Sequence, residues 1–359
     1  MVSCSFSRLF IPVVAVAAVA MLAIVFLEEG LLESGFPEAG AANRGGGPDP
    51  VTRSWLREWP RTDFSKHSVE LSEIFSGGPP KDGIPAIDRP HFIAMDKARG
   101  LGRDEPVISL ELNGEMRAYP LSVLIWHEIV NDTGGGVPVA VTFCPLGNSS
   151  IVFDRRLSFA GREWVLDFGT TGKLRRSDLV MYDRQSESWW QQFLGAAIVG
   201  ELTGAELTML PSRVESFDRF RYRAAEAKKE GRVLVPGNPA MRSYGRNPYA
   251  GYDSGRPFLY SGKTPENIAP LARVVVVGKE AWSLDLLRER GSLSVDDLVF
   301  TWTSGQNSAL DNARIARGRD VGNVTVQRRT EEGLEDAVYD VSFAFAFTAF
   351  YPEGVMHLE

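Results

Sequence analysis

The stretch VTFCPLGNSSIVFDR, residues 141–155, contains one of the two cysteines in the chain. A similar sequence occurs again further along the chain. A shift of 159 positions places Thr142 on Thr301 and the Asn-Ser pair 148–149 on the Asn-Ser pair 307–308. Upstream, LNGEMRAYPLSVL (112–124) resembles VVGKEAWSLDLL (276–287). Self-similarity at a fixed offset indicates an internal duplication, so we expect two related halves.

Each predicted half is rich in strands. Residues 105–121 alternate between apolar and polar around Asn113-Gly114, which favours a tight hairpin. An amphipathic helix is expected over 214–230, before Gly231, and FAFAF (343–347) predicts a strand with one bulky face. The predicted fold is therefore a β-rich α+β class, with one sheet-bearing half at 105–262 and a related one at 263–359.

The N-terminal region is more apolar than the rest of the chain. Residues 9–27 form a 19-residue uncharged apolar run, with Arg8 before it and Glu28-Glu29 after it. About 20 such residues span a bilayer, and the flanking arginine places the N-terminus in the cytoplasm. We expect residues 1–27 to be a transmembrane signal anchor, with a signal cleaved near AGAA (39–42) as the alternative. Either way the body lies outside the cytoplasm, in the periplasm or at the cell surface.

Residues 28–54 are predicted to be a flexible linker, because Gly, Pro and Ala dominate them, and residues 55–104 an extended segment leading into the first half. With 44% hydrophobic and 24% charged residues, the body has enough apolar side chains for a packed core. The net charge is −7 and no basic stripe is visible, so nucleic acid is not an expected partner.

Cys144 is predicted to be an unpaired thiol, because Cys4 precedes the anchor and lies across the membrane from it. The second copy has Thr303 in its place and no histidine opposite His127. Residues that the duplication does not repeat are the better functional candidates. They are Trp126, His127, Glu128, Asp132 and Cys144.

Three interpretations of Cys144 stay open. As a nucleophile it would use His127 as the base, with Glu128, Asp132 or Asp167 as the acid that orients the imidazole. Cys144, His127 and Glu128 are the catalytic candidates. As a metal ligand it would join His127 and His91, in a set that suits copper or zinc. As a small buried residue it would have no chemical role.

Two loops combine aromatic and polar side chains: YGRNPYAGYD (244–253) and MYDRQSESWWQQ (181–192). Such loops suit a ligand-recognition surface, and the alternative is a structural loop packed by its own tyrosines. The predicted ligand-binding residues are Trp126, Asp183, Arg184, Trp189, Tyr244, Tyr249 and Tyr252.

Several long motifs together resemble the prokaryotic domain-of-unknown-function family numbered 3179. They include GGPPKDGIPAIDRPHF (77–92), GEMRAYPLSVLIWHEIVND (114–132), GVPVAVTFCPL (136–146) and FAFTAFYPEG (345–354). The resemblance covers nearly the whole chain after the linker and implies no activity. Two hypotheses for the function therefore remain. The protein is either an anchored protein that binds a soft metal or a small ligand, or a thiol-dependent hydrolase or transferase.

Overall fold

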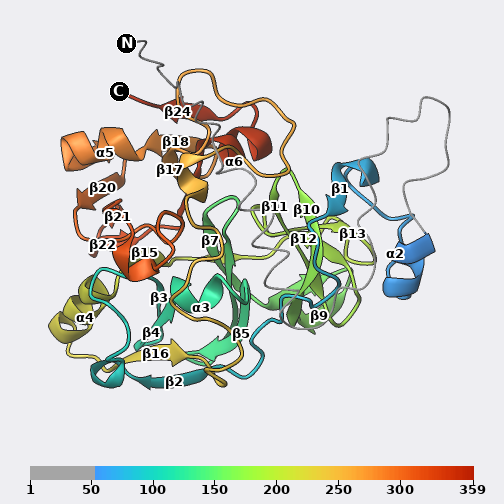
Figure 1. Cartoon of the computed structure of the whole chain (residues 1–359), viewed down its shortest axis with the longest axis horizontal. Coiled ribbons are helices and arrows are strands. Elements are labelled where there is room, and N and C mark those ends of the chain that lie inside the picture. The colour runs from blue at the N-terminus through green and yellow to red at the C-terminus, as the bar shows by residue number, and fades with distance from the viewer. Residues whose placement is uncertain (1–52) are drawn as a thin grey trace, which may run out of the picture.

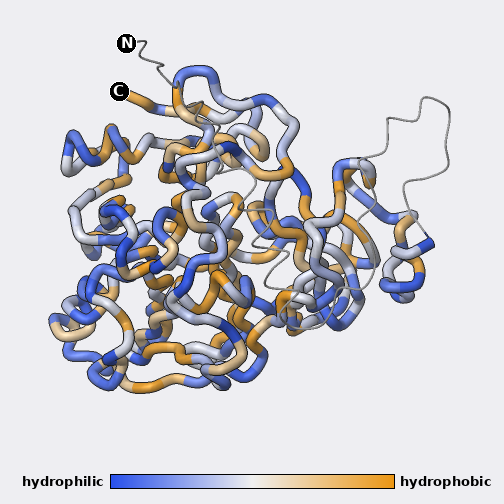
Figure 2. Tube along the Cα trace, in the orientation of Figure 1, coloured by the Kyte–Doolittle hydropathy of each residue, from blue (hydrophilic) through white to orange (hydrophobic). Residues whose placement is uncertain are grey.

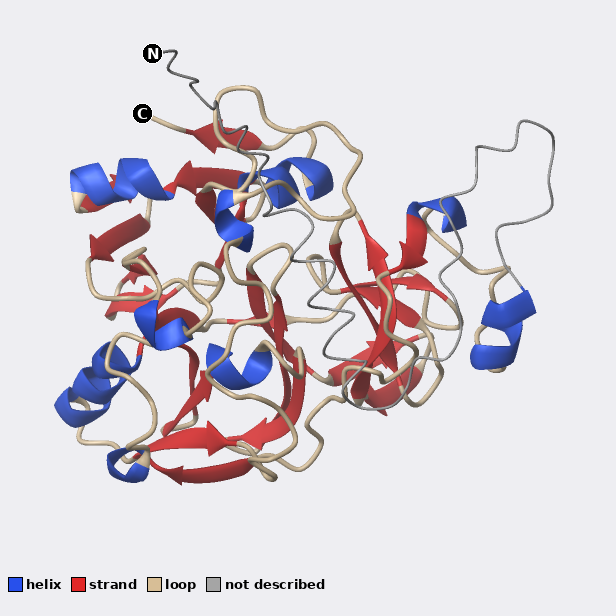
Figure 3. Cartoon of the chain, in the orientation of Figure 1, coloured by secondary structure: helices blue, strands red, loops and turns tan. Residues whose placement is uncertain are grey.

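The computed structural model describes residues 53–359. Strands hold 41% of these residues and helices 15%, and the strands form five sheets of four or five strands each. The sheets are the blades of a five-bladed β-propeller. The predicted α+β class with two sheet-bearing halves is therefore wrong, because short helices only connect the blades or cover their rims (Figure 3).

We number the blades I to V. Blade I contains β2 (His91–Ala94), β3 (Pro106–Leu112), β4 (Glu115–Pro120), β15 (Arg213–Ser216) and β16 (Gly231–Val235). Blade II contains β5 (Ile129–Gly134), β6 (Val137–Cys144), β7 (Ser149–Asp154) and β14 (Met209–Leu210). Blade III contains β1 (Ile74–Ser76), β10 (Phe168–Arg175), β11 (Asp178–Asp183), β12 (Trp189–Gln191) and β13 (Ala196–Val199).

Blade IV contains β17 (Arg273–Val277), β18 (Glu280–Ser283), β23 (Asp340–Phe343) and β24 (Val355–His357). Blade V contains β19 (Ser292–Val295), β20 (Leu298–Thr303), β21 (Asn323–Thr330) and β22 (Gly333–Asp336). A separate hairpin pairs β8 (Arg156–Phe159) with β9 (Arg162–Val165). The α-helices are α2 (Arg53–Glu58), α3 (Leu121–Leu124), α4 (Phe217–Glu226), α5 (Leu284–Arg290) and α6 (Ala344–Phe350).

Three strands of blades II and III are covered on both faces. Every residue of β7, β10 and β11 is buried. A strand covered on two sides shows no alternation of apolar and polar residues, unlike a strand with one face in water. The apolar segments accordingly follow the strands, whereas much of the outer helices α4 and α5 is hydrophilic (Figure 2).

Specific side chains join the blades to one another. The contacts are Tyr119 with Asp132 (2.6 Å), Asn131 with Phe168 (2.9 Å), Trp282 with Phe300 (rings 4.6 Å apart), Asn323 with Ser216 (2.7 Å) and, between blades II and IV, Ser150 with Asp340 (2.8 Å). Phe193, after β12, stacks on Phe350 of α6 (rings 4.7 Å apart). Both hydrogen bonds and aromatic packing therefore fix the angles between blades.

Blades I and IV share one connection pattern. In blade I, β15 pairs antiparallel with β3 and β16 pairs parallel with β4, with α4 between β15 and β16. In blade IV, β23, β17, β24, β18 and α6 repeat this arrangement. The 159-residue shift places the end of β6, Cys144, on the end of β20, Thr303. The match fails beyond that point, because β21 begins only at Asn323 and Asn307-Ser308 lie in a loop.

Of the predictions for single elements, some are confirmed and others are wrong. The hairpin at Asn113-Gly114 is confirmed, with both turn residues at positive φ between β3 and β4. The helix expected over 214–230 is shorter, since α4 spans Phe217–Glu226 and strands flank it. The strand expected at 343–347 is wrong, because α6 occupies it. Alternating Phe and Ala also bury well all round a short helix, and only Thr348 and Ala349 of α6 are not fully buried.

The predicted transmembrane segment and most of the linker lie outside the described residues. Within residues 53–359, no helix is long and apolar enough to cross a membrane.

The tyrosine loop, residues 244–253, lies between β16 and β17 and is tied to blades IV and V. Asp253 pairs with Arg273 at 3.0 Å and Arg319 at 2.8 Å, and it accepts a hydrogen bond from Ser308 at 2.6 Å. Although burial raises it, the Arg273 guanidinium holds the pKa of Asp253 below its ordinary value. A buried arginine therefore depends on this single carboxylate.

We predict that Asp253→Asn lowers the free energy of unfolding by about 3–5 kcal/mol, because it leaves Arg273 buried without its counter-charge. Urea denaturation measures the change. The matched control, Asp285→Asn, breaks an exposed pair with Arg288 and should leave stability unchanged. Equal behaviour of the two variants would show that the buried pair does not hold the loop.

Candidate functional site

Glu128 is the most unusual residue of the site. It lies between α3 and β5 with a φ of +58°, a left-handed conformation that non-glycine residues seldom adopt. Hydrogen bonds to the carbonyl of Leu124 (2.7 Å) and from the N–H of Phe143 (2.8 Å) hold its backbone in place. Backbone strain enforced in this way is typical of functional positions.

The Glu128 side chain is buried, with the residue only 7% exposed. Its carboxyl group makes no hydrogen bond to any other side chain or backbone group in residues 53–359. Burial, and then the nearby charge of Asp178, raise its pKa from 4.5 to about 8. The carboxyl group is therefore protonated at neutral pH and is a hydrogen-bond donor.

Cys144 and Asp178 lie beside Glu128, at the end of β6 and the start of β11. The backbone N–H groups of Gly147 and Leu179 are directed at the Cys144 sulfur. The Asp178 Oδ2 atom is buried and has no hydrogen-bond partner in residues 53–359. Burial, followed by the charges of Asp178 and Glu128, raises the pKa of Cys144 well above its ordinary value. We call Glu128, Cys144 and Asp178 the thiol–carboxyl cluster.

Asp178 is fully buried and has its own partners. It accepts hydrogen bonds from the side chain of Gln191 at 2.8 Å and from the N–H of Phe193 at 3.1 Å. Burial raises its pKa to about 7. The sequence analysis missed this residue. An aspartate opening the apolar strand DLVMY was the available signal, since a buried carboxylate needs an explanation.

Both ring nitrogens of His127 lie within hydrogen-bond distance of groups other than Cys144. Its Nδ1 lies 2.7 Å from the carbonyl of Pro85, and its Nε2 lies 2.8 Å from the hydroxyl of Tyr244. A carbonyl only accepts, so Nδ1 carries the proton and Nε2 accepts from the tyrosine. Burial lowers the pKa of His127, which keeps the imidazole neutral. Neither nitrogen is left to take a proton from Cys144 or to bind a metal.

The tyrosine loop covers the cluster. Tyr249 is half-buried, and burial, then the nearby Glu128 and Cys144, raise its pKa well above the ordinary value. Tyr252 donates to the carbonyl of Leu146 at 3.0 Å. The indole of Trp126 donates to the carbonyl of Arg246 at 3.2 Å and fastens the loop to the α3 side. The structure thus brings together two motifs that are about 100 residues apart in the sequence.

The proposed metal ligands are not gathered. His91 lies exposed on β2, in blade I, where it pairs with Val235 of β16. In the part of the chain that the structure describes, no three His, Cys, Asp or Glu residues are grouped to hold a metal ion.

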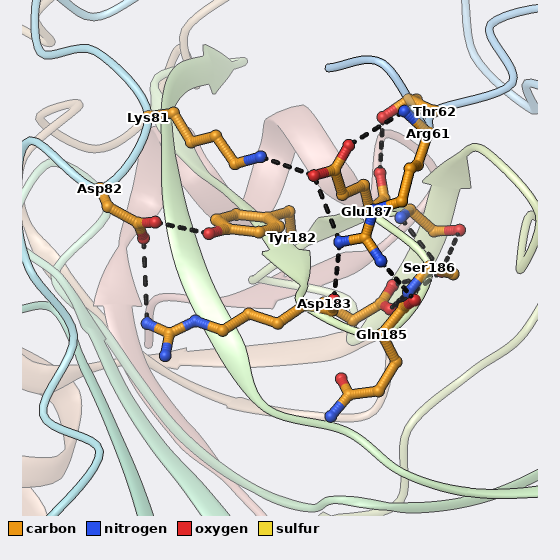
Figure 4. Close-up of polar contacts among 11 residues, drawn as sticks. Arg61, Thr62, Lys81, Asp82, Tyr182, Asp183, Gln185, Ser186 and Glu187 are labelled. Atoms are coloured by element: carbon orange, nitrogen blue, oxygen red, sulfur yellow. Dashed lines mark hydrogen bonds and ion pairs between the residues drawn. The ribbon is translucent and has the colours of Figure 1, made fainter. Parts of the chain in front are cut away.

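The remaining predicted ligand residues have different places. Asp183 is buried and accepts from Ser186 and from the indole of Trp190 at 2.9 Å, so it shapes the turn after β11. Trp189 is fully buried against Trp59, with ring centroids 5.3 Å apart. Arg184 instead faces outward and lines an open polar pocket, whose surroundings Figure 4 shows.

A family model described as "Protein of unknown function (DUF3179)" matches residues 81–354, which is most of the chain. No curated protein and no solved structure matches the chain.

The raised pKa of Glu128 predicts a specific pH dependence of stability. The unfolded chain ionises Glu128 above pH 4.5, whereas the folded protein keeps it protonated to about pH 8. Stability should therefore fall as pH rises across this window, by on the order of 5 kcal/mol in all.

Glu128→Gln, which removes this titration at equal size, should match the wild type near pH 4.5 and be more stable at pH 8. Urea midpoints at the two pH values measure this. A variant that is less stable than the wild type at both would mean that Glu128 is ionised in the folded protein.

Proposed function

The chain belongs to the DUF3179 family, and we propose that it is a membrane-anchored binding protein that takes a small uncharged ligand outside the cytoplasm. The ligand would sit at the thiol–carboxyl cluster, under the tyrosine loop. The membrane anchor rests on the uncharged run at 9–27 and on Arg8 before it.

The single observation that carries the proposal is the Glu128 carboxyl, buried, protonated at neutral pH and without a hydrogen-bond partner in residues 53–359. A buried polar group without a partner is unfavourable, and a ligand with an acceptor oxygen would satisfy it. The strained backbone at φ +58° holds the carboxyl in place for such a contact.

The charge state of the surroundings supports an uncharged ligand. His127 is neutral, and the pKa values of Cys144 and Tyr249 lie above their ordinary values. An anion brought into this environment would lose its hydration and be repelled by the Asp178 carboxylate, whose pKa is about 7. A ligand with a carbonyl or ether oxygen would accept the Glu128 proton without that penalty.

The second candidate function is a thiol-dependent enzyme, and one observation favours it. The N–H groups of Gly147 and Leu179 point at the Cys144 sulfur, where they would stabilise a thiolate. The neighbouring carboxyl groups act in the opposite direction, and the committed His127 supplies no base. A buried thiol with a raised pKa is a poor nucleophile at neutral pH.

Ligand binding is tested by thermal unfolding of the full chain in the presence of a library of uncharged amides, ketones and ethers. We predict that some members raise the melting temperature of the wild type but not of Glu128→Leu. The matched control, Glu163→Leu on the exposed hairpin, should keep the response. Stoichiometric copper or zinc in protein purified without chelator, lost in Cys144→Ser, would contradict the proposal and favour a metal site.

The thiol is tested in a Cys4→Ser variant, in which Cys144 is the only cysteine. We predict that an aromatic disulfide reagent leaves the native protein unmodified at pH 7 and labels it fully in guanidinium, because the thiol is buried and protonated. Rapid labelling of the native protein, abolished by His127→Ala, would instead establish the thiol enzyme.

A further inference from the structure

A second site lies on the other side of the segment 82–88. An open pocket of about 570 Å³ forms where this segment crosses β11 and the turn that follows β11. Its charged side chains are Arg61, Lys81, Asp82, Asp88, Arg184 and Glu187. The volume is that of a typical small-molecule site.

The charges in this polar pocket balance. Lys81 lies 2.8 Å and Arg61 3.2 Å from the Glu187 carboxylate (Figure 4). On the opposite wall, Arg184 bonds to Asp88. Three cations face three carboxylates, so the pocket has no net charge but a dense set of donors and acceptors.

Several of these groups have unused hydrogen-bonding capacity. The Lys81 ammonium has three N–H groups, and in residues 53–359 it donates only to Glu187. The Asp82 Oδ1 atom is buried, has no hydrogen-bond partner in that range and lies 3.9 Å from Arg184. The Lys81 ammonium thus offers unused donors at the pocket.

Two buried aromatic side chains, Tyr182 and Trp59, position the polar groups of the site. The ring of Tyr182 lines the pocket, while its hydroxyl donates to Asp82. The Lys81 ammonium lies 4.9 Å from the centre of this ring and 4.2 Å from that of Trp59. These cation–π contacts hold the ammonium in position at the pocket wall.

We propose that the polar pocket binds a neutral polyhydroxylated molecule of monosaccharide size. Each hydroxyl both donates and accepts, so adjacent hydroxyls match a carboxylate beside an ammonium or guanidinium. Because the three cations and three carboxylates balance, neither an anionic nor a cationic ligand would gain a net electrostatic attraction.

This site is independent of the proposed function. Pro85 lines the polar pocket, while its carbonyl accepts from His127 on the side of the thiol–carboxyl cluster. The segment 82–88 therefore separates the two sites, and either could be occupied without the other.

Titration calorimetry of the full chain, in a detergent without a sugar headgroup, tests the proposal with glucose, mannose and myo-inositol as probes and citrate as the anionic comparison. We expect saturable binding of at least one neutral probe. Asp82→Asn and Arg184→Gln should each weaken it about tenfold, the effect of losing one charged hydrogen bond. Arg162→Gln, in an exposed pair with Glu201, is the matched control and should bind as the wild type.

Absence of saturable binding to all three neutral probes would overturn the proposal, as would tighter binding of citrate. So would unchanged affinity in both Asp82→Asn and Arg184→Gln. The far-ultraviolet circular dichroism of each variant, compared with that of the wild type, confirms that a lost affinity does not come from a lost fold.

Discussion

Glu128 is a buried residue, and its carboxyl group receives no hydrogen bond from the residues that the structure describes. A group in that position is most stable when it keeps its proton. The chemistry around it follows from the same desolvation. Cys144 and Tyr249 hold their protons more tightly than in water, and His127 stays neutral. The result is a polar interior in which Glu128, Cys144, Tyr249 and His127 are neutral and can form hydrogen bonds with a neutral molecule.

The propeller fold buries these side chains and so removes them from water. Blade II is covered on both faces, so the end of β6 is buried deeply enough to exclude water from Cys144. The remaining side is covered by the tyrosine loop, which has little regular structure of its own. Its position depends on Asp253, held by Arg273 of blade IV and by Arg319 before β21. A buried ion pair thus holds one end of the loop that covers the thiol–carboxyl cluster.

Sequence reasoning found the parts of the site but not its assembly. Cys144, Glu128 and the tyrosines were predicted, because unmatched residues and aromatic loops are visible in the chain. The partner of Cys144 was not, since Asp178 joins it only through the contact of blade III with blade II. His127 was assigned to Cys144, but a proline carbonyl and Tyr244 take both of its nitrogens.

The fold escaped prediction for related physical reasons. Blade I draws β2, β3, β4, β15 and β16 from positions as far apart as His91 and Val235, with strands of blades II and III lying between them in the sequence. Residues 273–357 alone form two blades, IV and V, so each half of the chain forms more than one sheet. Strands covered on both faces lose the alternation that would identify them. The hairpin at Asn113-Gly114 was predictable because its turn chemistry is local, whereas α6 was mistaken for a strand because tertiary burial decided its conformation.

The protonation state of Glu128 is the central claim, and a carboxyl titration followed by nuclear magnetic resonance tests it most directly. In protein labelled with ¹³C at glutamate side chains, the Glu128 resonance is the one absent from Glu128→Gln. The account predicts that this resonance titrates near pH 8. A midpoint near 4.5, the ordinary value for glutamate, would contradict it.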